Sequence, residues 1–136
     1  MIEMDHNVIM LLACFFAGWA STMNVWVDKW DDIYLHLNDF YMVGLMTGWM
    51  FFFMGLFEWN TNKMLFGGLG AALFFYLIRN QTFVTEIQYL RGMIPHHSMA
   101  IHMSHKLKNS SIQPLLDEII DNQEKEIILM KHYLDG

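Results

Sequence analysis

Long apolar stretches fill the first half of the chain and predict helices that could cross a membrane. Residues 7–27 form 21 consecutive positions without an acidic or basic side chain. At a rise of about 1.5 Å per residue, a helix of that length matches a hydrocarbon core of about 30 Å. A second uncharged stretch covers residues 40–57, between Asp39 and Glu58. Both stretches are predicted to be transmembrane helices.

A third apolar stretch, residues 64–78, has only 15 residues and is short for a membrane span. Lys63 and Arg79 can extend their charged ends toward the membrane surface, and Asn80 to Thr82 can lengthen the helix. We therefore predict a span over residues 64–82 and a membrane domain over residues 1–82. The acidic N-terminus and the long first stretch are unlike a cleavable signal peptide, so we expect the first span to be retained.

Aromatic residues near the ends of these spans predict a belt at the membrane surface, where amphipathic rings gather. Trp26, Trp30, Tyr34 and Tyr41 fall on one side, and Trp59 falls on the other. Small-residue steps inside the spans, such as Gly44 and Gly48, permit close contact between helices. The sequence thus predicts a lipid bilayer and either a homo-oligomer or a membrane complex as partners.

The remaining residues, 83–136, predict a helical hairpin. The first helix begins near Thr82 or Thr85 and ends near Leu107, and the KNSS sequence at residues 108–111 forms the turn. Ser110 or Ser111 can cap the second helix, which tolerates Pro114 in its first turn and continues to the end of the chain. The predicted fold class is therefore all-α, with three transmembrane helices followed by a two-helix hairpin.

Charge and cysteine content exclude several kinds of function. The formal net charge of −6 argues against a nucleic-acid partner, which would need a basic surface. The single cysteine, Cys14, lies inside the first span, so neither a disulfide framework nor a thiolate metal site is expected. No phosphate-binding loop or serine nucleophile motif is present, and the chain is expected to bind rather than catalyse. Candidate chemistry is confined to His, Met and carboxylate side chains.

The first hairpin helix contains an unusual concentration of metal-ligating residues. Residues 91–105, RGMIPHHSMAIHMSH, include four histidines and three methionines. At about 100° per residue, one side of the helix carries two imidazoles and three thioethers, which belong to Met93, His96, His97, Met99 and Met103. His102 and His105 fall on the opposite side, either in a solvated face or in a second, weaker site. Pro95 is predicted to kink the helix near these side chains.

The second hairpin helix can complete this site. Glu126 and Met130 lie within or beside its apolar stripe, so they meet the histidines if the two stripes face each other. Imidazole and thioether ligands together suit copper, whereas zinc more usually takes thiolates or a tetrahedral His and carboxylate set. Glu126 can be a ligand or can orient one histidine. The alternative is that these methionines only fill gaps in the core.

The hairpin resembles the family called domain of unknown function 305. The resemblance is carried first by Met93-Ile94-Pro95-His96-His97, Ala100-Ile101 and Met103, and later by Gln123, Glu126-Ile127, Met130 and Tyr133-Leu134. It implies a ferritin-like helical fold, an association with copper, and metal ligation by Met93, His96, His97, Met103, Glu126 and Met130. Three N-terminal spans with Tyr41-Met42 resemble a membrane-anchored branch of the family. Its soluble members imply an extracytoplasmic hairpin, whereas Lys29, Arg79 and Arg91 slightly favour a cytoplasmic one.

Two functions from different classes therefore stand open. One is a membrane-anchored copper-binding or copper-tolerance protein, and the other is a structural or accessory membrane subunit whose His and Met residues only pack. An oxidoreductase or a Cu(I) conduit built on the same ligands is a third possibility. Methionines recur every four residues down the second span, where they either pass Cu(I) or pack, at Met42, Met46, Met50 and Met54.

Overall fold

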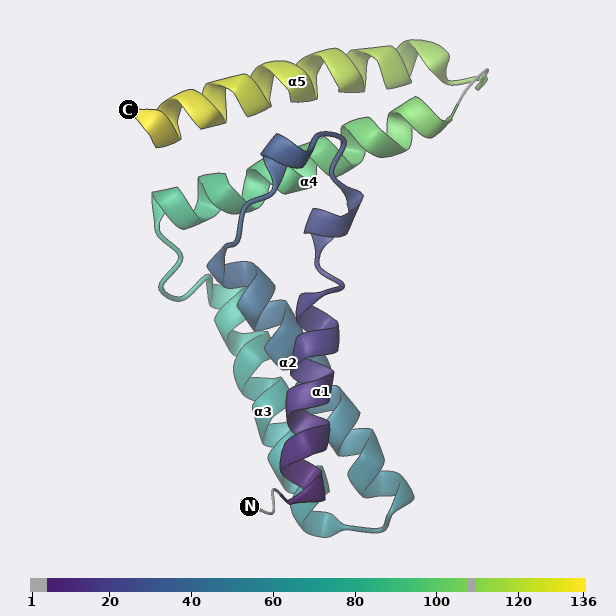
Figure 1. The fold of residues 1–136 in the computed structure, drawn as a ribbon, viewed down its shortest axis with the longest axis vertical. Helices are drawn as coiled ribbons and strands as arrows, with labels where there is room; N and C mark the ends of the chain where they lie inside the picture. Colours follow the sequence, from purple (N-terminus) through teal and green to yellow (C-terminus); the bar gives the residue numbers. More distant parts are fainter. Residues whose placement is uncertain (1–4, 108–109) are drawn as a thin grey trace. The chain divides into compact units, whose positions relative to one another are not determined.

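All the regular secondary structure in the described residues is helical. The computed structural model describes residues 5–107 and 110–136, so Lys108 and Asn109 of the predicted turn lie outside it. The elements in Figure 1 are α1 (His6–Trp19), η1 (Met23–Trp26), η2 (Trp30–Asp32), α2 (Leu37–Phe57), α3 (Thr61–Asn80), α4 (Glu86–Lys106) and α5 (Gln113–Asp135). The all-α prediction is confirmed. The chain divides into two compact units, each described separately below.

The first unit, Met1–Thr22 with Asn38–Phe83, holds the three apolar helices. Asp5 caps α1 by accepting from Asn7 N, and Asn60 caps α3 by accepting from Lys63 N. By length and composition, three helical segments could cross a membrane, at His6–Trp26, Leu37–Phe57 and Thr61–Asn80. These bounds lie within three residues of the expected spans at 7–27, 40–57 and 64–82. The first combines α1, which ends at Trp19, with η1, so the expected helix over 7–27 is interrupted and Met23–Trp26 belongs to the second unit.

Glycines bring α2 and α3 into backbone contact within the first unit. A Cβ atom added at Gly48 would lie 2.6 Å from the backbone N of Ala71, and one added at Gly67 would collide with the backbone N of Phe52. At Gly44 an added Cβ would lie 2.5 Å from the Phe74 ring. Gly44 and Gly48 therefore allow α2 to pack closely against α3 within one chain. Association with further copies stays a prediction.

Several side chains of the predicted membrane helices lie differently from expectation. Tyr41 is buried, and its hydroxyl donates a 2.7 Å hydrogen bond to the Thr82 carbonyl, so its ring is not part of an exposed belt.

Met42, Met46 and Met50 of α2 are all exposed. The terminal methyl of Met46 nevertheless lies against Gly18 of α1, where an added Cβ would collide with it. Transport along these methionines stays a prediction.

The second unit, Met23–Leu37 with Val84–Gly136, contains the hairpin. Helices α4 and α5 run side by side, as Figure 1 shows. The Thr85 hydroxyl caps α4, as predicted, by accepting from Gln88 N. The expected cap of α5 is wrong, because its N-cap is Ile112 and the Ser110 hydroxyl accepts from Ile112 N without capping the helix.

The core of the second unit lies between α4 and α5 and includes a residue from the segment 23–37. Its buried members are Ile94, Ile101, Ile127 and Met130. Helix α4 continues through Pro95, which is fully buried. Tyr34 packs against this core rather than standing in the predicted aromatic belt. The segment 23–37, which we expected to belong to the membrane domain, therefore forms part of the hairpin unit.

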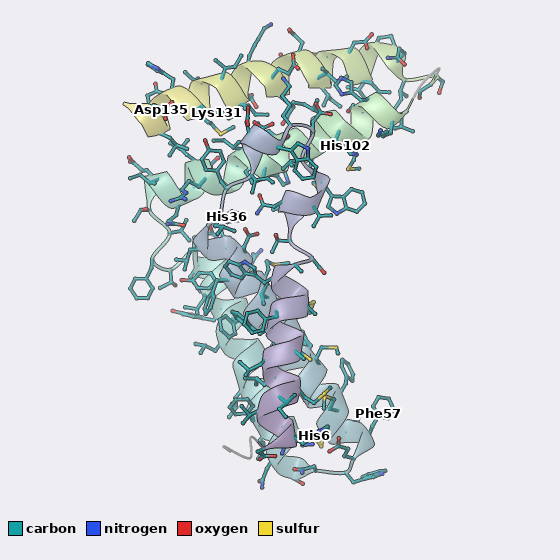
Figure 2. The ribbon with its side chains drawn as sticks, in the orientation of Figure 1. His6, His36, Phe57, His102, Lys131 and Asp135 are labelled. Atoms are coloured by element: carbon teal, nitrogen blue, oxygen red, sulfur yellow. The ribbon has the colours of Figure 1, made fainter. Side chains whose placement is uncertain are left out.

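A buried carboxylate fastens the segment 23–37 to both hairpin helices. Asp32 is only 2% exposed and accepts 2.6 Å hydrogen bonds from the Ser98 hydroxyl of α4 and from the Lys131 ammonium of α5. Figure 2 labels Lys131 on α5. The Ser98 hydroxyl also accepts from the backbone N of Asp28 at 2.8 Å. Because every member of this group is paired, the charge of Asp32 is tolerated in a buried position.

Removing this carboxylate should loosen the hairpin. Asp32→Ala leaves Ser98 and Lys131 without their acceptor, so we expect a loss of about 2–3 kcal/mol in the stability of the second unit. Amide hydrogen exchange of α4 and α5 in the full-length protein measures it. Asp31→Ala is the matched control, because Asp31 is exposed on the same short helix and its loss should change stability by less than about 0.5 kcal/mol. Equal exchange rates in the two variants would contradict the assigned role of Asp32.

Candidate metal centre

His97 of α4 and Glu126 of α5 are predicted ligands from different hairpin helices whose polar side chains contact each other. The Nδ1 atom of His97 lies 3.0 Å from Oε2 of Glu126. The His97 side chain is 12% exposed, whereas that of Glu126 is 54% exposed. The buried Nδ1 atom has no hydrogen-bond partner of acceptable geometry despite this short distance. The imidazole is therefore held at the edge of the core, beside a carboxylate that reaches solvent.

Burial sets the protonation state of His97. Loss of solvent lowers the pKa of His97 below its usual value of 6.5, the Glu126 carboxylate partly opposes that change, and His96 lowers the pKa further. A pKa below its usual value makes the neutral imidazole the main form at pH 7. Neutral imidazole is the form that binds metals, so His97 needs little or no proton loss to act as a ligand.

Two predicted thioether ligands lie in the hairpin core. Met130 is 9% exposed and belongs to the buried cluster, and Met93 packs against that cluster. These positions fit the alternative interpretation, in which the methionines only fill gaps in the core. A soft sulfur atom at this position also provides the ligand type that copper accepts beside imidazole.

The other candidates on this side of α4 reach the surface. His96 is exposed, Met99 is half-buried and Met103 is 49% exposed. The imidazole centroids of His96 and His97 are 6.2 Å apart, with their planes tilted by 54°. His96 thus lies on the solvent side of His97. The structure brings His97 and Glu126 into contact and leaves His96 and Met103 at the accessible edge of the hairpin.

His102 and His105 lie near an acidic residue of the segment 23–37. Their Nδ1 atoms are 3.7 Å and 3.2 Å from Oδ1 of Asp28. Figure 2 labels His102 on α4. This contact separates the two histidines from the pair formed by His97 and Glu126. A metal role for His102 and His105 stays a prediction, and polar contact with Asp28 is the simpler account of their placement.

No group of three or more His, Cys, Asp or Glu side chains is placed to hold a metal ion within residues 5–107 and 110–136. Methionine is outside that set of residue types, so the finding concerns nitrogen, oxygen and thiolate ligands.

The sequence interpretation overlooked His36. This residue is buried, and its imidazole packs on Gly92 of α4, where an added Cβ would lie 3.1 Å from Nδ1 of His36. Burial lowers the pKa of His36, and the charge of Arg91 lowers it further. A glycine inside a helix often marks such a close approach. Gly92 was therefore the available signal that another group packs on the His and Met helix.

Comparison with known proteins places the hairpin in a defined class. Residues 77–134 match the family described as Domain of unknown function (DUF305), and this region includes all of α4 and most of α5. The chain is also 44% identical over 140 residues to "Uncharacterized protein L153" of Acanthamoeba polyphaga mimivirus. That alignment covers 94% of this chain and 90% of the viral protein. No solved structure matches the chain.

Through its residues 77–134 this chain therefore belongs to the family of domain of unknown function 305. The viral relative extends the similarity across the apolar helices as well as the hairpin. Neither name states an activity or a ligand.

The burial of His97 and its contact with Glu126 predict how its pKa differs from the usual value. Its pKa should lie below 6.5 in the folded protein, and Glu126→Gln should lower it further by removing the charge that stabilises the imidazolium. Because the unfolded chain takes up this proton first, folding stability should decrease as the pH falls below about 6.5 and level off below the folded-state pKa. NMR titration of the imidazole signals measures the His97 pKa in the wild-type protein and in Glu126→Gln.

Glu124→Gln provides the control for that titration, because Glu124 lies 3.6 Å from Lys29 rather than next to His97. It should leave the His97 pKa unchanged. A His97 pKa above 6.5 would contradict the dominant effect of burial. A pKa that does not fall in Glu126→Gln would show that the contact described between α4 and α5 is absent in solution.

Proposed function

We propose that this protein is a membrane-anchored copper-binding protein that holds copper on its C-terminal hairpin, in a role such as copper tolerance. The membrane placement is supported by three helical segments of sufficient length and apolar composition. The family resemblance favours an extracytoplasmic hairpin. In this arrangement the apolar helices anchor the chain in the membrane, and α4 and α5 bind the metal.

The observation that carries the proposal is the contact between His97 and Glu126. It places a neutral, largely buried imidazole next to a carboxylate, and its Nδ1 atom is not committed to a well-formed hydrogen bond. Thioethers of Met93 and Met130 lie in the adjoining core. These residue types fit copper, since imidazole accepts either oxidation state and thioether favours Cu(I).

The remaining proposed ligands are His96 and Met103. Both are exposed on α4, so their side chains can reorient when a metal arrives without disturbing the core. Glu126 is exposed as well, and it can either bind the metal or orient His97 by accepting its N–H. Bound copper would supply a redox-active or storage centre. The chain's own contribution is to hold ligands of two types near one another.

A structural or accessory role in a membrane complex is the second candidate. It is favoured by the burial of Met130 and by the packing of Met93 against the core, because both residues already have a use without metal. The fully paired group around Asp32 also stabilises the hairpin without a metal ion. Under this alternative, changes at the histidines would leave metal content unaffected.

A double substitution distinguishes the two candidates. His96→Ala with His97→Ala should weaken Cu(I) binding by at least about tenfold, because it removes both imidazoles of the proposed site. Competition with a Cu(I) chelator on the purified full-length protein measures the affinity. His102→Ala with His105→Ala is the matched control from the same helix and should retain most of the affinity.

Equal copper affinity in the double variant and the wild-type protein would exclude this site and favour the structural role. Preferential loss of affinity in the control variant would instead locate the metal at His102 and His105. Circular dichroism of both variants ensures that the comparison is made between folded proteins.

A further inference from the structure

The three apolar helices line a cavity that is partly open at the surface of the unit, where its lining residue Phe66 is 61% exposed, and that the copper site does not use. Its volume is about 220 Å³, and α1, α2 and α3 all contribute to its wall. From α1 come Leu11 and Phe15. No charged residue lines it, and Thr47 of α2 is the one lining residue with a hydroxyl group. Cavities lined by Leu and Phe side chains stay free of water and accept apolar ligands.

The cavity is elongated along the helices. On α2 its lining positions run from Gly44 to Phe51, and on α3 they run from Phe66 to Phe74. At about 1.5 Å per residue these stretches extend for about 10–12 Å. On each helix the lining residues recur every three or four positions, so they form one continuous face. The space between the helices is therefore long and narrow.

Gly70 of α3 keeps this space open. A Cβ atom added at Gly70 would have nothing within 4 Å, although this glycine lines the cavity. Glycine is among the least favourable residues inside a helix, so it usually has a packing reason there. Gly48 and Gly67 have that reason in the backbone contact between α2 and α3. Gly70 has no such contact, and its effect is to leave room for something else.

We propose that the cavity binds a hydrocarbon chain of a bilayer lipid, which lies along the three helices. The proposal rests on the membrane placement proposed above. A helix from a second copy could only cover the open side and could not lie inside, since a helix with side chains is about 10–12 Å wide and the cavity has a volume of about 220 Å³. A single compact ring would leave part of the length empty, whereas a flexible chain fills it and avoids the cost of a void.

Photolabelling in vesicles tests the proposal directly. The full-length protein is reconstituted in phosphatidylcholine vesicles that contain a lipid with a diazirine in the middle of one acyl chain, and labelled residues are located by mass spectrometry. In the wild-type protein we expect Phe15 and Phe74 to be labelled at least as strongly as the outward-facing Leu69, which is 70% exposed. Flotation of the vesicles establishes membrane insertion in the same sample.

Two matched glycine variants of α3 provide the comparison. Gly70→Leu fills the cavity, so labelling of Phe15 and Phe74 should fall severalfold while that of Leu69 is unchanged. Gly68→Leu is the control, because Gly68 does not line the cavity and its added Cβ would make only an ordinary contact of 3.5 Å with Phe52. If Gly70→Leu fails to insert, the smaller Gly70→Ala should still give a partial decrease.

The outcomes separate this proposal from the membrane placement. Unchanged labelling of Phe15 and Phe74 in the Gly70 variants would overturn the cavity proposal alone, and so would labelling confined to outward residues in the wild-type protein. Failure of the wild-type protein to float with the vesicles would overturn both the membrane placement and the lipid proposal. Copper binding is measured separately and does not depend on either result.

Discussion

The hairpin depends on a carboxylate that comes from a distant part of the chain. Two helices alone can bury little of their apolar surface, so α4 and α5 need a third element against them. The segment 23–37 is that element, and Asp32 bonds to Ser98 of one helix and Lys131 of the other. The same segment adds Tyr34 to the core. Fixing α4 against α5 in this way also fixes His97 opposite Glu126.

Helix α4 consequently has two chemically different sides. His102 and His105 lie close to Asp28 of the segment 23–37, whereas His97 faces Glu126 of α5. The four histidines of one short sequence are thus divided between a polar contact with Asp28 and a candidate metal site. Helix α5 also combines both roles, since Lys131 holds the segment and Glu126 contacts His97.

Periodicity predicted much of this arrangement but not the contacts between distant segments. Helical spacing was sufficient to divide His102 and His105 from Met93 and His97, and to place Glu126 near the histidines. It could not show that the segment 23–37 joins the hairpin, because Asp32 finds its partners 66 and 99 residues further along the chain. The positions of Tyr34 and Tyr41 were mispredicted for a similar reason. Local composition suggested rings at a membrane surface, but it does not reveal that distant residues cover them. The predicted N-cap of α5, Ser110 or Ser111, was wrong because Ile112 is the residue at that position.

The proposed function requires the hairpin to hold copper through His and Met ligands. Elemental analysis of the full-length protein, purified without added metal from cells grown with copper, tests it most directly. The account predicts copper in near-stoichiometric amount, with little zinc or iron. Protein that is folded and free of copper, or that carries zinc or iron in its place, would contradict it.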